Sequence, residues 1–200
     1  MKSMKKIMIW GSNLFLDVLF DLKKGYICTA DNCSFKLSTK FIVDNFSMKS
    51  LSSKKALNML LKALRLDSNY DSAIIELGTV DMINILNEEE LLDDFRNNLS
   101  QIITSLKYCG IKVYLVTLCP IEPLKYQFKN NIKACTNDII LIHRRINRAI
   151  KELAVLYGVE VIDDNKTISK NKYAYLSEDG DSINAYGHSL IEAMVSRKIV

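Results

Sequence analysis

Short runs of apolar residues alternate along this chain with longer stretches in which apolar residues recur every three or four positions. Five short runs are rich in Ile, Val or Leu and are bounded by Gly, Asn, Asp or Pro. Such runs are typical of buried parallel strands. They predict strands at residues 7–10, 41–43, 73–77, 113–118 and 159–162.

The stretches between these runs predict amphipathic helices, with apolar stripes at residues 56–64, 92–106 and 142–153 and a last helix at about 184–197. Gly110 and Gly158 follow the second and third stripes as stop signals. Strand–helix alternation implies a parallel sheet with helices on both faces. Residues 23–40 read as a polar, irregular surface excursion, and residues 121–137 as a long segment that could border a site.

Length and composition narrow the class of protein further. Two hundred residues with 48% hydrophobic content fit one α/β domain over residues 1–200. The net charge is +4, and the basic pairs are scattered along the chain. This distribution does not indicate a nucleic-acid partner. Five cysteines without regular spacing argue against a disulfide framework, and two histidines give no pattern for a metal site.

The N-terminal apolar run is too short for a signal sequence, and no segment reaches the roughly 18 apolar residues of a membrane span. We therefore expect a cytoplasmic protein. No motif calls for a cofactor, and the oligomeric state stays open.

Ligands of open parallel sheets bind at the carboxyl ends of the strands. The polar residues expected there include Ser12 and Asn13 after the first strand and Thr79 after the third. Ser12 and Asn13 could cap a helix, or could present a hydroxyl, an amide and N–H groups to an anion or a carbonyl oxygen. These two roles can coexist.

Asp179 lies in the last loop, shortly before the last predicted helix. It could be an acid that the dipole of this helix stabilises, or it could orient an imidazole. No histidine lies within three residues of it, however. His188 lies farther along, inside the helix, and is expected to be packed or capped rather than catalytic. His143 is expected to be a surface or structural residue far from the strand ends.

At these loops the chain resembles the SGNH/GDSL hydrolases, a family of esterases, lipases, thioesterases and carbohydrate-acetyl esterases. The resemblance rests on Gly11-Ser12-Asn13, on Gly78-Thr79-Val80-Asp81 and on Asp179-Gly180-Asp181-Ser182 followed by Gly187-His188. It implies a three-layer, flavodoxin-like, doubly wound fold with a five-stranded parallel sheet. It also implies a site for an acyl-ester or carbohydrate-ester ligand.

Four positions depart from the family pattern. Asn13, Ser50, Val80 and Ser182 stand where the resemblance would place Ser, Gly, Asn and His. The nucleophile hydroxyl, the general base and one oxyanion donor would therefore be absent, whereas Ser50 keeps its backbone N–H.

Three hypotheses follow. The first is a non-hydrolytic relative that binds a small ligand or partner, with a polar rim of Ser12, Asn13, Ser50, Thr79, Asp179 and Ser182. The second is an active ester hydrolase with a rearranged site, in which Ser12 is the nucleophile and Asp179 supports a histidine brought in from elsewhere. The third is an unrelated doubly wound nucleotide-binding domain, which the lack of a Gly-rich phosphate motif disfavours.

Overall fold

The computed structural model describes residues 4–12, 14–16, 19–21, 25–27 and 32–199. Its main sheet has five parallel strands in the order β4-β1-β5-β6-β7, and a separate antiparallel hairpin joins β2 and β3. The strands are β1 Lys6–Gly11, β2 Leu19–Asp21, β3 Gly25–Ile27, β4 Ile42–Asn45, β5 Ser72–Glu76, β6 Lys112–Val116 and β7 Glu160–Ile162. All five strands predicted from the apolar runs are confirmed in type and approximate position.

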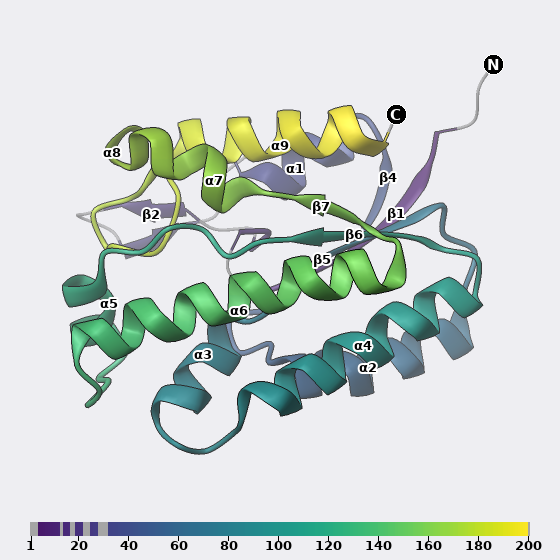
Figure 1. The fold of residues 1–200 in the computed structure, drawn as a ribbon. Helices are drawn as coiled ribbons and strands as arrows, with labels where there is room; N and C mark the ends of the chain where they lie inside the picture. The colour runs from purple at the N-terminus through teal and green to yellow at the C-terminus, as the bar shows by residue number, and fades with distance from the viewer. Residues whose placement is uncertain (1–3, 13, 17–18, 22–24, 28–31, 200) are drawn as a thin grey trace.

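Helices cover both faces of the main sheet, which confirms the three-layer doubly wound fold (Figure 1). One face is covered by α2 Ser53–Leu66, α3 Thr79–Leu86, α4 Leu92–Tyr108 and α6 Thr136–Tyr157. The other is covered by α1 Cys33–Ser38, α7 Asp164–Ile168 and α9 Ala185–Ile199. The short elements α5 Pro123–Lys129, η1 Ser169–Asn171 and α8 Lys172–Tyr175 complete the described chain.

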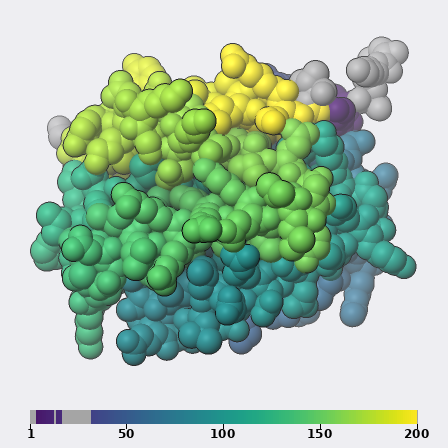
Figure 2. Space-filling model, in the orientation of Figure 1, coloured from purple at the N-terminus to yellow at the C-terminus, as the bar shows by residue number. Residues whose placement is uncertain are grey.

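Successive side chains of a strand point to opposite faces of the sheet, so each face of this sheet has its own hydrophobic core. Met8 and Trp10 of β1 pack with α2, α4 and α6, whereas Ile7 and Ile9 pack with α1 and α9. Because both faces are covered, every residue from Ile7 to Gly11 is buried. In Figure 2 the last helix lies along one side of the molecule, opposite the helices of residues 53–108.

The expectation that residues 23–40 form an irregular surface excursion was wrong, and the long segment at residues 121–137, expected to border a site, contains a helix. Residues 23–40 include α1, whose Cys33 and Leu37 are fully buried in the core under α9. Residues 121–137 include α5, where Pro123 occupies the first helical turn. Both helices are only one or two turns long, so their apolar pattern is too brief to stand out in the sequence. No helix of the described ranges is long and apolar enough to cross a membrane.

Candidate functional site

A buried carboxylate organises the turn that follows β1. Strands β1 and β5 are neighbours, and their register sets Gly11 opposite Glu76. The Ser12 N–H donates to Glu76 Oε2 at 2.8 Å, and the Leu14 N–H donates to the same oxygen at 3.4 Å. On the other side, Thr79 Oγ1 donates to Glu76 Oε1 at 3.5 Å. Glu76 thus links Ser12 and Thr79, two residues that the sequence singled out.

Gly11 is required because Glu76 lies so close to the backbone. A Cβ on Gly11 would lie 3.0 Å from Glu76 Oε2, 3.2 Å from Phe15 Cδ2 and 3.3 Å from Ser47 Oγ. Contacts that short would push the carboxylate away from the Ser12 N–H. The glycine therefore serves the packing of this turn.

Two hydroxyl groups beside this turn make no hydrogen bond. Ser12 Oγ and Ser47 Oγ are both buried, and neither has a hydrogen-bond partner among the described residues. Ser12 as a residue is 4% exposed. A buried hydroxyl without a partner is unfavourable, so these two oxygens leave hydrogen-bonding capacity unmet beside the turn.

The loop after β4 runs alongside the same turn. The Met48 N–H donates to the Gly11 carbonyl oxygen at 3.0 Å, and Asn45 Nδ2 donates to the Phe15 carbonyl oxygen at 2.9 Å. Ser50, in contrast, is exposed, and its Oγ accepts from Lys55 Nζ at 3.2 Å. Within the described residues, no hydrogen bond joins Ser50 to the other predicted site residues.

The side chain of Asp81 is bound by the first turn of α2. It is fully buried and accepts from the Ser53 N–H at 3.0 Å and from the Ser53 hydroxyl, at the first turn of α2. Burial raises the pKa of Asp81 to about 6, although the bonds from Ser53 oppose the shift. Val80 beside it is half-buried and offers no side-chain donor.

A second carboxylate cluster lies in the loop before α9. Asp179 Oδ2 accepts from the Ser182 hydroxyl at 2.7 Å and from Lys129 Nζ at 2.7 Å, and Oδ1 accepts from the Ser182 N–H at 3.0 Å. Lys129, from the last turn of α5, also forms an ion pair with Asp181. The sequence-predicted pair Asp179 and Ser182 is therefore in direct contact.

The electrostatics of this cluster follow from burial and from Lys129. The Asp179 side chain is 5% exposed. Burial alone would raise its pKa, but the hydrogen bonds from Lys129 and Ser182 outweigh burial and lower the pKa to about 2. For Asp181 burial dominates and raises the pKa to about 6, despite Lys129. Asp179 is thus the firmly ionised member of the pair.

Both histidines of the chain are engaged away from Asp179. His188 is 2% exposed, and its Nδ1 accepts from the Cys33 N–H at 3.1 Å, at the start of α1. Burial lowers its pKa to about 4, so the ring is neutral near pH 7. His143 Nε2 lies 2.8 Å from the Cys119 carbonyl oxygen. The expectation that His143 lies far from the strand ends was wrong, because Cys119 follows β6.

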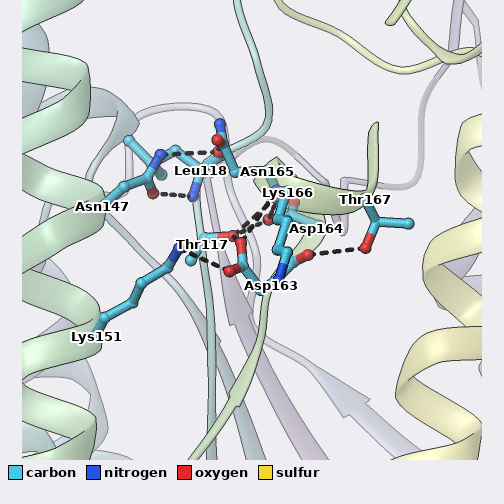
Figure 3. Close-up of polar contacts among 9 residues, drawn as sticks. All are labelled: Thr117, Leu118, Asn147, Lys151, Asp163, Asp164, Asn165, Lys166 and Thr167. Atoms are coloured by element: carbon cyan, nitrogen blue, oxygen red, sulfur yellow. Dashed lines mark hydrogen bonds and ion pairs between the residues drawn. The ribbon is translucent and has the colours of Figure 1, made fainter. Parts of the chain in front are cut away.

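The end of β6 is fixed by a dense polar network (Figure 3). Asn147 of α6 both accepts from the Leu118 N–H at 2.7 Å and donates to the Leu118 carbonyl oxygen at 3.2 Å. Asp164 is fully buried and accepts from the Thr117 hydroxyl and from the Cys119 thiol, the latter at 3.1 Å. Burial raises the pKa of Asp164 to about 7 and that of the Cys119 thiol well above its ordinary value.

Sequence reasoning missed three residues of this edge. Glu76 could have been found, since it is the only acidic residue of the apolar run 73–77 and stands two residues before Gly78. Lys129 and Asp164 gave no such signal, because their partners are 50 and 47 residues away in the chain. Asn13, which the sequence also singled out, lies outside the described residues.

The described ranges contain no group of three or more His, Cys, Asp or Glu side chains that could hold a metal ion. The polar groups of the edge instead form two clusters. We call Glu76 with Ser12, Leu14 and Thr79 the Glu76 cluster, and Asp179 with Lys129, Asp181 and Ser182 the Asp179 cluster.

Comparison with known proteins identifies the fold. No protein-family model matches the sequence, and the curated proteins include no significant match. Solved structures, however, match over nearly the whole chain. A lipase/acylhydrolase from Enterococcus faecalis has a TM-score of 0.75 at 19% identity, covering 98% of this chain and 95% of that one.

Two further structures agree. A GDSL-like lipase from Bacteroides thetaiotaomicron has a TM-score of 0.71 at 16% identity, with coverage of 98% and 87%. The esterase EstA from Pseudoalteromonas sp., in a structure inhibited by monoethylphosphonate, has a TM-score of 0.69 at 15% identity, with coverage of 98% and 96%. The chain therefore has the α/β fold of the SGNH/GDSL esterases and lipases.

Proposed function

We propose that this protein is a non-hydrolytic relative of the SGNH/GDSL esterases that binds a small ligand at the carboxyl edge of its sheet. One observation carries the proposal. Asp179, the carboxylate that would orient an imidazole, is bound by Lys129 and Ser182 instead. Hydrolysis of the triad type needs a base that removes the nucleophile proton, and a protonated lysine on a carboxylate cannot act as one.

The engagement of the two histidines supports the same proposal. His188 accepts a backbone N–H of α1 through Nδ1, and His143 contacts the Cys119 carbonyl oxygen. To serve Asp179, His188 would have to leave a site where it is 2% exposed and would unpair the Cys33 N–H. A rearranged hydrolytic site would therefore require repacking of α1 against α9.

The proposed ligand is an ester-like or polyol-like small molecule. Ser12 Oγ and Ser47 Oγ are buried without a partner, so each can donate to a carbonyl oxygen or accept from a hydroxyl. The structural relatives include lipases and an esterase, so an acyl or carbohydrate ester is the class to test first. The Glu76 cluster would hold the backbone beneath such a ligand.

To test the proposal, the purified protein is treated with a fluorophosphonate probe, and any adduct is located by peptide mass spectrometry. Hydrolysis of p-nitrophenyl acetate is measured in parallel. We expect no adduct on Ser12 and the same background rate in wild type and in Ser12→Ala. An adduct on Ser12, with turnover that disappears in Ser12→Ala, would instead establish the alternative function, an esterase with Ser12 as nucleophile.

A gain-of-function variant provides the positive control. Asn13→Ser with Ser182→His restores the two side chains that the family resemblance calls for. Lys129→Met is added to remove the lysine from Asp179, and we expect this triple variant to react with the probe, because residue 182 already lies within hydrogen-bond reach of Asp179. Binding is tested separately by thermal shift with glucose pentaacetate, where we expect a shift in wild type that shrinks in Ser12→Ala.

A further inference from the structure

The edge of the sheet opposite the candidate site carries several exposed apolar side chains. Leu66 is 89% exposed at the end of α2, and Tyr108 is 93% exposed at the end of α4. Val155 and Leu156, in the last turn of α6, are 84% and 72% exposed. These three helix ends lie on the same side of the molecule, where the strands of the main sheet begin (Figure 1).

The ends of α2, α4 and α6 adjoin one another. A cavity of about 490 Å³ between α2 and α4 is lined by residues that include Leu61, Arg65 and Tyr108. A second hollow of about 340 Å³ begins at Lys107 and reaches Gly158, past the end of α6. Lys107 Nζ also donates to the Tyr157 carbonyl oxygen at 2.5 Å, which ties the end of α4 to the end of α6.

The charge of this surface is mainly positive. Lys62 and Arg65 of α2 are exposed, and neither they nor Lys107 has a carboxylate partner among the described residues. Helix α2 itself contains no acidic residue. Two nearby carboxylates are neutralised by other bases, because Asp67 pairs with Lys6 and Glu160 pairs with Lys112 and Lys198. Asp71, which is also exposed near this edge, accepts the Lys6 backbone N–H.

We propose that this amino-edge surface, made of Arg65, Leu66, Lys107, Tyr108, Val155 and Leu156, docks on an anionic membrane. Exposed Leu, Val and Tyr side chains enter the interface between headgroups and acyl chains, and basic residues beside them are attracted to anionic headgroups. An acidic protein partner would cover the same cations and apolar side chains, and absence of binding to anionic vesicles would point to it instead.

The proposal goes beyond the proposed function, because docking does not depend on what the carboxyl edge binds. It also fixes an orientation. The candidate site lies at the opposite edge, so it would face away from the bilayer, and the membrane would be an anchor rather than a source of ligand.

The test is co-sedimentation of the full chain with vesicles of phosphatidylcholine and phosphatidylglycerol in equal parts, compared with phosphatidylcholine alone. Each basic residue near an anionic surface contributes about 1 kcal/mol, so Arg65→Glu with Lys107→Glu should weaken binding by at least about tenfold. Leu66→Ser with Tyr108→Ser should weaken it several-fold at any salt concentration. All four positions are exposed, so the variants should melt close to the wild type, with a small loss in the charge variant because residue 107 no longer donates to the Tyr157 carbonyl oxygen.

The chain offers a matched control at the carboxyl edge. Phe128 is 82% exposed and Tyr173 is 80% exposed, so Phe128→Ser with Tyr173→Ser removes comparable apolar surface from the other end. We expect this variant to bind vesicles as the wild type does. Absence of binding to the anionic vesicles would overturn the proposal, and so would an equal loss in the control variant.

Discussion

The two polar clusters at the carboxyl edge are built differently. Glu76 accepts hydrogen bonds from the N–H groups of Ser12 and Leu14, which lie in the turn that follows β1, the strand paired with its own. Asp179 instead depends on the Lys129 side chain, from a helix 50 residues earlier in the chain. The first cluster therefore follows from the pairing of β1 with β5, whereas the second depends on contacts between side chains that are distant in the sequence.

Under the proposed non-hydrolytic function, the fold keeps its shape without a catalytic triad. The backbone around the first strand end is held by Glu76, which does not require a catalytic serine. At the second cluster, Lys129 supplies the positive charge beside Asp179 that a protonated imidazole would supply. Each substitution below breaks one cluster and leaves the other intact.

The largest effect is expected for Glu76→Ala. It removes the acceptor of the buried Leu14 N–H, leaves the Ser12 N–H only its longer bond to the carbonyl oxygen of residue 76, and opens a cavity, so it should lower the free energy of unfolding by about 3 kcal/mol. Urea denaturation measures this loss. The control is Glu76→Gln, whose amide oxygen can still accept an N–H and which should cost clearly less. A loss in Glu76→Ala of under about 1 kcal/mol would mean that the turn is held by other contacts.

An intermediate effect is expected for Lys129→Met. It leaves Asp179 and Asp181 buried beside each other without their cation. Because Lys129 is 24% exposed, water can replace part of its effect, and we expect a loss of about 2 kcal/mol at pH 7. The control is Lys125→Met on the same helix, because Lys125 is exposed and takes part in no ion pair of the described chain.

The same variant predicts a pH dependence. The pKa of Asp179 is lowered to about 2 in the folded protein, below its ordinary value of 3.8. A lowered carboxyl pKa stabilises the fold above pH 4, and that stability is lost as the pH falls from 4 to 2. Removing Lys129 removes this contribution, so the difference between Lys129→Met and wild type should shrink over that pH range. A difference that stays constant from pH 7 to pH 2 would contradict the ionic role of Lys129.

The fold could be predicted from the sequence, whereas half of the site could not. Strands buried on both faces appear as unbroken apolar runs, so β1 and β5 were visible, as was the polar turn at Ser12. The link from Glu76 to Ser12 needs the pairing of those strands, which the runs alone do not state. Lys129 reaches Asp179 only because α5 packs over Gly180, whose φ of +90° and lack of a side chain allow the contact.

The smallest effect distinguishes two serines of the predicted polar rim, Ser12 and Ser182. Ser182→Ala removes a hydroxyl that donates to Asp179 at 2.7 Å, so it should cost about 1 kcal/mol and raise the pKa of Asp179. Ser12→Ala removes a buried hydroxyl that makes no hydrogen bond, so its stability should lie within about 0.5 kcal/mol of wild type or slightly above it. Urea denaturation of both variants without ligand makes the comparison. A cost for Ser12→Ala as large as that for Ser182→Ala would mean that the Ser12 hydroxyl is already satisfied within the protein, and the ligand site would then have to be sought at the Asp179 cluster.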